Sequence, residues 1–210
     1  IEHQAKTASL ILMDPTTGAI ISMCSLPDFD PNNYSDVEDI GTYNNTTIFT
    51  PYEPGSVFKP IIMSVALDLV LVSPLTTYTD TGERIINGRP LNNALNKKYG
   101  LSTMTNVLEN SINTGMIWVS EKINKERFKS YVEKFGFGKK TGIGLDTEVA
   151  GNISPLSKSA DIYTAVGSYG QGLTVTPLQL VAAYGVLAGG GRLPKPYIVD
   201  EIRHASGRTE

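Results

Sequence analysis

The sequence contains one cysteine and two histidines, and these low counts exclude several kinds of site. Cys24 has no second cysteine to pair with, so an internal disulfide is excluded. His3 and His204 lie near the two ends of the chain, which argues against a Ser-His-Asp triad or a histidine metal site. Cys24 stands in a strand-like apolar run, where we expect it to be buried and unreactive. We expect neither a metal nor an organic cofactor.

The chain also lacks a long apolar run and a strong excess of charge of one sign. No stretch reaches about 18 consecutive apolar residues, and no signal peptide opens the sequence. The net charge of −3 gives no electrostatic reason to expect nucleic acid or an anionic membrane surface as a partner. The 210 residues are 40% hydrophobic and 19% charged, which is typical of one globular domain or two small lobes.

The order of apolar and turn-forming residues predicts a mixed fold. Alternating apolar residues predict an antiparallel hairpin over about 8–24, and a polar crossing follows from residue 27 to about 45. Short strands and turns are expected between residues 76 and 98, and a final strand over 196–204. The expected helices run over about 56–70, 102–110, 116–123, 125–134 and 177–187.

Residues 53–60 hold the first candidate catalytic motif, with the sequence EPGSVFKP. The Pro-Gly pair predicts a turn, and the apolar run that follows predicts a buried helix. Ser56 and Lys59 then stand one helical turn apart on one face of that helix. A lysine in a dry pocket can lose its proton and act as the base that activates a serine hydroxyl. The alternative interpretation of this motif is that Ser56 only caps the helix and that the Lys59 side chain is solvated.

Ser111 and Asn113 form the second candidate motif, in a turn between two expected helices and 55 positions after Ser56. A serine hydroxyl there can pass protons, and an asparagine amide can hold a substrate carbonyl and contact the lysine. Taken alone, serine and asparagine at such a place often only cap a helix. Combined with Ser56 and Lys59, they form a specific candidate site for nucleophilic catalysis by a serine.

Further motifs give a family resemblance over nearly the whole chain. In order, they are DPTTG at 14–18, FDPN at 29–32, EPGSVFKP at 53–60, SIN at 111–113, FGFGKKTG at 135–142 and GQGLTVTPLQ at 170–179. With these motifs the chain resembles the transpeptidase domain of class B penicillin-binding proteins. The resemblance implies an α/β (α+β) fold, in which an antiparallel sheet flanked by helices is joined to a mainly helical lobe.

The resemblance also implies how the chain is divided. A lobe with the sheet is expected over about 1–74 and 166–210, and a helical lobe over about 75–165, with the active-site cleft between them. The family's remaining strands, its C-terminal helix and its Lys-Thr/Ser-Gly strand are expected beyond residue 210. We therefore interpret Lys140-Thr141-Gly142 as a structural turn. The isolated chain is expected to be weakly active or inactive, because losing one oxyanion donor costs about 10²–10³ in rate.

The implied activity is that of a peptidoglycan D,D-transpeptidase. Ser56 would attack the penultimate D-alanine carbonyl of a stem peptide, and an amine of a neighbouring stem would then attack the acyl-enzyme. Lys59 would be the base for Ser56, Ser111 would relay the proton, and Asn113 would hold the peptide. β-Lactams would acylate Ser56 and leave slowly.

The expected partners are peptidoglycan stem peptides, β-lactam antibiotics and a membrane-bound cell-wall synthesis complex, and not nucleic acid. The domain is expected on the outer side of the cell membrane, anchored by an N-terminal segment, in a division- or sporulation-associated enzyme. Two alternatives remain open. One is a D,D-carboxypeptidase or β-lactamase of the same superfamily, and the other is a non-catalytic scaffold or penicillin-sensing domain.

Overall fold

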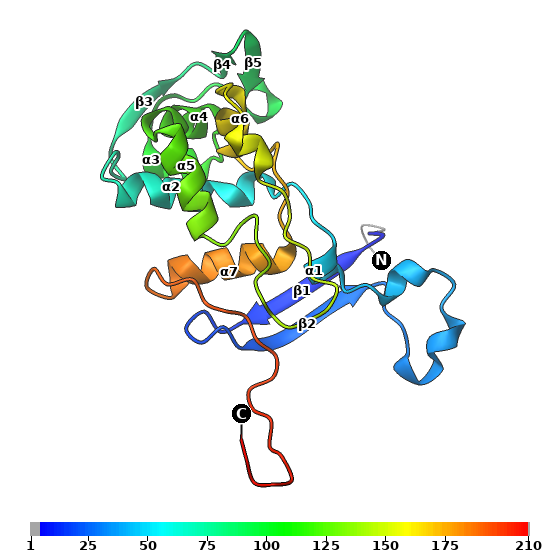
Figure 1. The fold of residues 1–210 in the computed structure, drawn as a ribbon. Coiled ribbons are helices and arrows are strands. Elements are labelled where there is room, and N and C mark those ends of the chain that lie inside the picture. The colour runs from blue at the N-terminus through cyan, green and yellow to red at the C-terminus, as the bar shows by residue number, and fades with distance from the viewer. Residues whose placement is uncertain (1–4, 210) are drawn as a thin grey trace. The chain divides into compact units, whose positions relative to one another are not determined.

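The computed structural model describes residues 5–209, which contain both short strands and helices (Figure 1). The chain forms two compact units. Among the described residues, the sheet unit holds 5–51, 139–150 and 176–209, and the helical unit holds 52–138 and 151–175. Three segments group differently from the predicted lobes: 52–74 and 166–175 group with the helical unit, and 139–150 group with the sheet unit. His3 lies outside the described residues.

The sheet unit begins with the predicted hairpin, which is confirmed. Strand β1 (Ala8–Met13) pairs antiparallel with β2 (Ile20–Leu26). In the turn between them, Gly18 has a φ of +85°, and a side-chain carbon there would stand 2.3 Å from the carbonyl oxygen of Lys195. Glycine is therefore needed at Gly18 both for its backbone conformation and for this close approach.

Two helices, α1 (Thr46–Phe49) and α7 (Pro177–Ala188), pack on the hairpin, as Figure 1 shows. The buried contact consists of Ile48, Ile143 and Leu178, with Ile11, Ile20 and Met23 packed against it. Helix α7 was predicted from its Thr-Pro start and is confirmed. The Thr176 hydroxyl accepts a hydrogen bond from the backbone N–H of Gln179, and the Gln179 side chain accepts one from the backbone N–H of Thr176.

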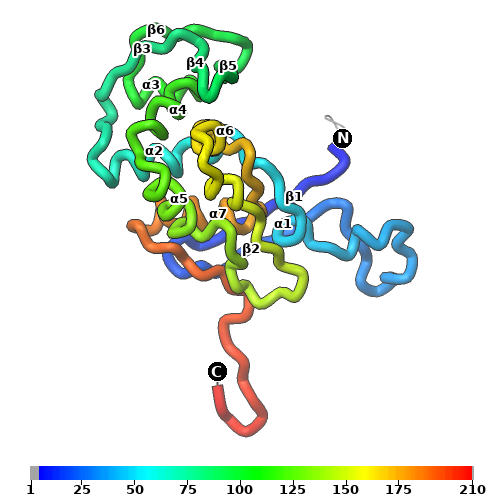
Figure 2. The backbone as a smooth tube through the Cα atoms, turned by 45° about the horizontal axis from the view of Figure 1, so that its top comes forward, coloured from blue at the N-terminus to red at the C-terminus, as the bar shows by residue number. Residues whose placement is uncertain are grey.

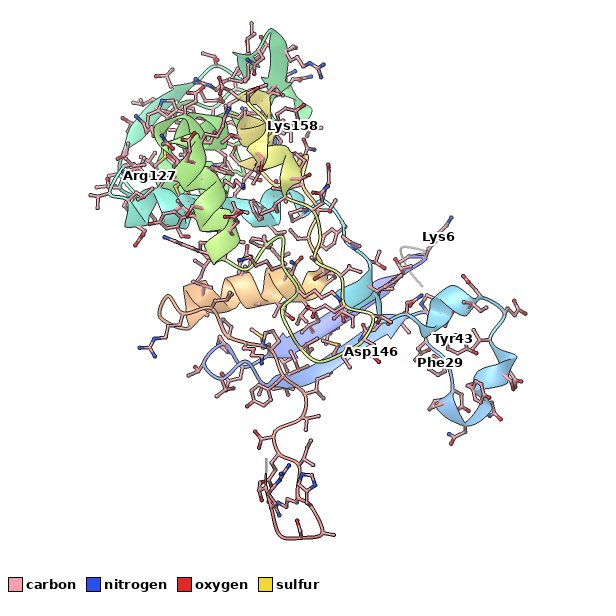
Figure 3. All side chains as sticks on the ribbon, viewed as in Figure 1. Lys6, Phe29, Tyr43, Arg127, Asp146 and Lys158 are labelled. Carbon is pink, nitrogen blue, oxygen red and sulfur yellow. The ribbon has the colours of Figure 1, made fainter. Side chains whose placement is uncertain are left out.

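The polar crossing between the hairpin and α1 holds two short 3₁₀ helices, η1 (Pro31–Asp36) and η2 (Ile40–Tyr43). Asp30 caps the first of them by accepting a hydrogen bond from Asn32. The rings of Phe29 and Tyr43 meet edge to face with centroids 5.0 Å apart (Figure 3). The FDPN motif therefore supplies local caps and a ring contact within this segment.

Two expectations about the sheet unit are wrong. Cys24 is exposed, because the alternation along β2 turns Met23 toward the core and its neighbour toward the opposite face. Residues 196–204 form no regular strand in the described part of the chain. They make only single bridges, from Tyr197 to Ala19 and from Arg203 to Thr209, because no neighbouring strand continues the ladder.

The helical unit is built around two central helices. Helix α4 (Asn113–Lys122) packs against α2 (Lys59–Asp68), and the two lie side by side in both Figure 1 and Figure 2. The other helical segments of this unit are η3 (Gly55–Phe58), η4 (Ala94–Asn96), α3 (Met104–Glu109), α5 (Lys125–Lys134), η5 (Ser154–Ser157) and α6 (Ile162–Gly167). The predicted helix over 125–134 is confirmed with the same bounds.

Four short strands complete this unit in two antiparallel pairs. They are β3 (Thr77–Asp80) with β6 (Gly100–Thr103), and β4 (Glu83–Ile86) with β5 (Arg89–Asn92). The strand β6 was not predicted. The helix that we expected from residue 102 begins at Met104, with Thr103 as its cap. None of the helices between residues 5 and 209 has both the length and the apolar content that a membrane crossing requires.

Candidate active site

Ser56 lies in η3, the 3₁₀ turn that runs directly into α2, and its side chain is exposed. Gly55 before it has a φ of +61°, a left-handed conformation that favours glycine. Phe58 in the same turn is fully buried. The turn is therefore fixed by a glycine on one side and a buried ring on the other, while Ser56 itself stays exposed.

The backbone of residues 170–172 supports the turn that carries Ser56. The N–H of Gly55 donates to the carbonyl of Gly170 at 2.9 Å. A side-chain carbon at Gly170 would stand 2.2 Å from the Gly55 carbonyl oxygen, so the two chain segments can approach this closely only with glycine there. The Glu53 carboxylate also accepts from the N–H of Gly172 at 2.9 Å. The GQG stretch thus holds the loop that leads to the serine.

The FGFG stretch supports the same turn from another side. The rings of Phe58 and Phe137 lie 5.1 Å apart between centroids, and neither ring is exposed. Gly138 has a φ of +77°, and a side-chain carbon there would collide with Ile153. This part of the motif therefore packs beneath the turn that carries Ser56.

Lys59 follows Ser56 by three residues as the first residue of α2, and only 1% of it is exposed. Its Nζ lies 2.5 Å from the carbonyl oxygen of Ser111, 2.9 Å from the Ser111 Oγ and 2.7 Å from Oδ1 of Asn113. Burial lowers the pKa of Lys59 to about 8. The structure thus brings the two candidate motifs together at the lysine amine.

These three partners suit Lys59 in either protonation state. An ammonium donates three hydrogen bonds, and all three partners can accept one. A neutral amine donates two hydrogen bonds and accepts one. The carbonyl oxygens of Ser111 and Asn113 can then take the two donors, while the Ser111 hydroxyl donates to the nitrogen. With a pKa of about 8, roughly a tenth of the lysine is neutral at pH 7.

Ser111 and Asn113 stand at the junction of α3 and α4. Ser111 has a φ of +52°, which is unusual for a residue other than glycine. We expected Asn113 in a loop before a helix starting at Met116, and this is wrong, because Asn113 is the first residue of α4. The Nδ2 of Asn113 donates to the carbonyl of Asn92 at 3.1 Å, which turns its Oδ1 toward Lys59.

Residues 140–142 lie in the sheet unit, outside any strand. The buried carboxylate of Glu148 accepts from the N–H and the hydroxyl of Thr141 at 2.5 and 2.6 Å, and from the N–H of Gly142 at 3.1 Å. The Lys140 side chain is exposed. This geometry supports the interpretation of Lys-Thr-Gly as a structural turn, and the absence of Lys140 from the catalytic site stays a prediction.

A group of buried polar residues that was not predicted from the sequence lies next to the start of α4, namely Asp80, Asn93 and Thr114. Their mutual contacts span between 13 and 34 positions of the chain, so no local spacing could reveal them. In the described part of the chain, no three acidic, histidine or cysteine side chains are grouped in a way that could hold a metal ion.

Comparisons with known proteins identify the family of the chain. Residues 8–210 match the sequence model of the penicillin binding protein transpeptidase domain. The stage V sporulation protein D of Bacillus subtilis is 39% identical over 193 residues, which are 91% of this chain and 30% of that protein. The peptidoglycan D,D-transpeptidase FtsI of Escherichia coli is 32% identical over 189 residues, or 90% of this chain and 32% of that protein.

Solved structures are similar over almost the whole chain. Penicillin binding protein 3 of Mycobacterium tuberculosis, complexed with aztreonam, superposes with a TM-score of 0.87 at 30% identity. Its complex with ampicillin gives a TM-score of 0.88, and each match covers 98% of this chain and 46% of that one. The chain spans about a third of the length of the curated relatives it matches. It belongs to the penicillin-binding protein transpeptidase family, as a domain of the class B type.

Proposed function

We propose that this chain carries the acyl-transfer centre of a peptidoglycan D,D-transpeptidase, with Ser56 as the nucleophile. The observation that carries the proposal is the buried Lys59 amine, bound to Ser111 and Asn113 and one turn from an exposed serine. A lysine with a pKa of about 8 can take a proton near neutral pH, which an ordinary surface lysine cannot.

In the first step, the Ser56 Oγ attacks the carbonyl carbon of the penultimate D-alanine, and its proton passes to Lys59. The peptide C–N bond then breaks. The leaving D-alanine nitrogen takes a proton, which the Ser111 hydroxyl can deliver because it lies 2.9 Å from the lysine nitrogen. The products are an ester on Ser56 and free D-alanine, and Lys59 is neutral again.

In the second step, the amine of a neighbouring stem peptide attacks the ester. A new C–N bond forms, the C–O bond to Ser56 breaks, and a proton from the amine returns to the serine oxygen through Lys59. Asn113 has its Nδ2 bound to Asn92 and its Oδ1 to Lys59, so in this state it orients the base. An amide nitrogen carries two N–H groups, so the contact with the peptide that we expect of Asn113 can use the second N–H while both of these bonds stay in place.

β-Lactams fit the same chemistry. Attack by Ser56 would open the lactam C–N bond, and the leaving nitrogen would stay tethered to the acyl group, so that an incoming amine meets a blocked ester. Two of the similar structures are complexes of penicillin binding protein 3 with aztreonam and with ampicillin. These complexes support β-lactams as ligands of this site. We further propose that the domain acts on the outer side of the cell membrane, within a cell-wall synthesis complex.

Product analysis tests this proposal in the intact protein that contains the chain. A stem-peptide analogue ending in D-Ala-D-Ala is supplied together with an acceptor amine, and the products are separated by mass. We expect D-alanine and the amine-linked peptide, and neither from the Ser56→Ala variant. Release of only the shortened peptide would identify a carboxypeptidase. Rapid turnover of penicillin would identify a β-lactamase. The absence of any reaction would identify a scaffold or sensor. Each of these three results would overturn the proposal.

A further inference from the structure

Helix α4, which carries Asn113, begins without a cap of its own. Its N-cap residue, Ile112, has no side-chain hydrogen bond to the first turn. The backbone N–H of Thr114 donates instead to Oδ1 of Asn93 at 3.0 Å, across 21 positions of the chain. Because free N–H groups at a helix start need partners, Asn93 takes the place of the missing cap. The start of α4 is therefore anchored from outside the helix.

Asp80, the last residue of β3, organises this anchor and is only 3% exposed. Its carboxylate accepts from the Thr114 hydroxyl at 2.5 Å and from Nδ2 of Asn93 at 3.0 Å. It also accepts from the N–H groups of Gly82 at 3.1 Å and Tyr99 at 2.8 Å. Burial works to raise the pKa of Asp80, but these hydrogen bonds outweigh it and lower the pKa. The carboxylate is therefore ionised.

Two consecutive residues outside α4 hold two consecutive residues of its first turn. The carbonyl of Asn92 accepts from the side chain of Asn113, and the side chain of Asn93 accepts from the backbone of Thr114. The other end of the Asn113 amide accepts from Lys59 at 2.7 Å. The hydrogen bonds and the covalent Asn92–Asn93 link thus connect the buried carboxylate to the lysine amine.

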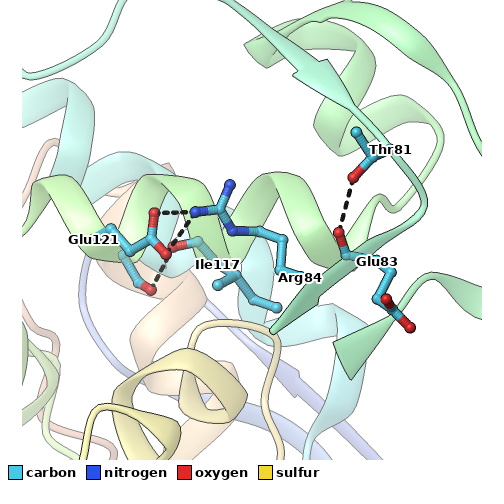
Figure 4. Close-up of polar contacts among 6 residues, drawn as sticks. Thr81, Glu83, Arg84, Ile117 and Glu121 are labelled. Atoms are coloured by element: carbon cyan, nitrogen blue, oxygen red, sulfur yellow. Dashed lines mark hydrogen bonds and ion pairs between the residues drawn. The ribbon is translucent and has the colours of Figure 1, made fainter. Parts of the chain in front are cut away.

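A residue of the neighbouring strand β4 also contacts the far end of α4. Arg84 of β4 donates to both carboxylate oxygens of Glu121 at 2.7 and 2.5 Å, as Figure 4 shows. The helix is therefore held at its first turn by Asp80 and Asn93 and near its last turn by Arg84. Both ends of the helix therefore have hydrogen-bond partners in the segment from Asp80 to Asn93.

We propose that Asp80, Asn93 and Thr114 are positioning residues for acyl transfer, which hold the Asn113 amide and, through it, the Lys59 amine. This inference rests on the proposed function. Burying a carboxylate costs desolvation energy, and a well-packed apolar cluster can be as stable. An apolar cluster would not fix the orientation of its neighbours. The Asp80 carboxylate does so, because it accepts hydrogen bonds from four donors in fixed directions.

The test is the first-order rate constant of acylation at saturating penicillin, measured on the intact protein. Asp80→Asn keeps the shape but removes the charge and one acceptor. We expect the rate constant to fall about 10²-fold, the cost of a small misplacement of catalytic groups, while the concentration giving half-maximal rate changes little. Val132→Ala, in the buried part of α5, is the control for lost stability and should keep the rate constant.

Three further variants separate positioning from folding. Thr114→Val removes the hydroxyl and should slow acylation, whereas Thr114→Ser keeps it and should retain the rate. Asp80→Asn/Asn93→Asp exchanges carboxylate and amide and should recover part of the rate that Asp80→Asn alone loses. Wild-type rates in both Asp80→Asn and Thr114→Val would overturn this inference alone. The inference would also be overturned if Val132→Ala, with the same melting temperature as Asp80→Asn, lost as much of the acylation rate constant. No acylation of the wild-type protein at Ser56 would overturn the proposed function with it.

Discussion

Lys59 owes its chemistry to its position at the start of α2. The short turn before it leaves Ser56 exposed, while the lysine itself points into the helical unit and loses its contact with water. The sequence predicted both residues, because three positions on a helix share one face. It also predicted Ser111 and Asn113 as partners, and the structure places both at the amine. The catalytic roles of the four residues stay predictions.

The pH dependence of acylation tests the role of Lys59. The neutral amine is the form that can accept a proton, and burial lowers the pKa of Lys59 to about 8. We therefore expect the acylation rate constant to rise about tenfold per pH unit below pH 8 and to level off above it. Stopped-flow measurements with a chromogenic β-lactam give this profile.

Lys59→Arg is the control for this pH profile. Arginine keeps a positive charge but does not lose its proton, so the rate should fall by about 10²–10⁴ and the rise with pH should disappear. A profile that is flat between pH 6 and 9 in the wild-type protein would contradict a basic role for Lys59.

Among the elements, those with local end signals were predicted and those with distant partners were not. Helices α5 and α7 carry their own caps, at Asn124 and Thr176, and their bounds follow from the sequence. Helix α4 begins three residues earlier than expected because its cap comes from Asn93. The strand β6 was missed because four residues show no clear alternation, and it is defined by its pairing with β3. The periodicity of apolar residues along the chain does not predict these long-range contacts.

Gly170 allows two segments of the helical unit to approach each other closely. Its backbone supports the turn that leads into α2, and a side-chain carbon there would stand 2.2 Å from the Gly55 carbonyl oxygen. Gly170→Ala should therefore slow acylation and lower the free energy of unfolding by more than the roughly 1–2 kcal/mol that a left-handed alanine costs. Chemical denaturation and penicillin labelling measure the two effects.

The matched control for Gly170→Ala is Gly88→Ala in the turn between β4 and β5. Gly88 has a similar φ of +76° but has no neighbouring atom within 4 Å of an added side-chain carbon. It should show only the backbone cost and keep its acylation rate. Equal losses in the two variants would show that the close approach to Gly55 has no importance.

At the scale of the whole molecule, the four candidate residues all belong to the helical unit, although the chain passes between the units four times. The motifs that reveal the family are spread over both units. Residues 135–138 and 170–172 support the serine turn, whereas Gln179 holds the sheet unit together. Periodicity predicted individual strands and helices, and the family resemblance implied the mixed fold. The grouping of residues 52–74 with the helical unit depends on packing between distant helices.

Gln179 allows a test of how far the two units act separately. Its buried side chain donates to the carbonyls of Lys139 and Ala150 at 2.7 and 2.8 Å. Gln179→Ala leaves both without this donor and should lower the free energy of unfolding by about 2–3 kcal/mol. The apparent pKa of acylation should stay near 8, because the partners of Lys59 all lie in the helical unit. A shifted pKa in the folded variant would show that the two units are coupled.

The site at which penicillin acylates the protein tests directly whether Ser56 is the nucleophile. The intact protein is treated with penicillin, digested, and its peptides are analysed by mass spectrometry. We predict one stable adduct, on the peptide that contains Ser56, with the modified oxygen assigned to that serine by fragmentation. Ser56→Ala should carry no adduct, and Lys59→Arg should acquire it far more slowly. An adduct on another residue, or labelling of Ser56→Ala at the wild-type rate, would contradict the account.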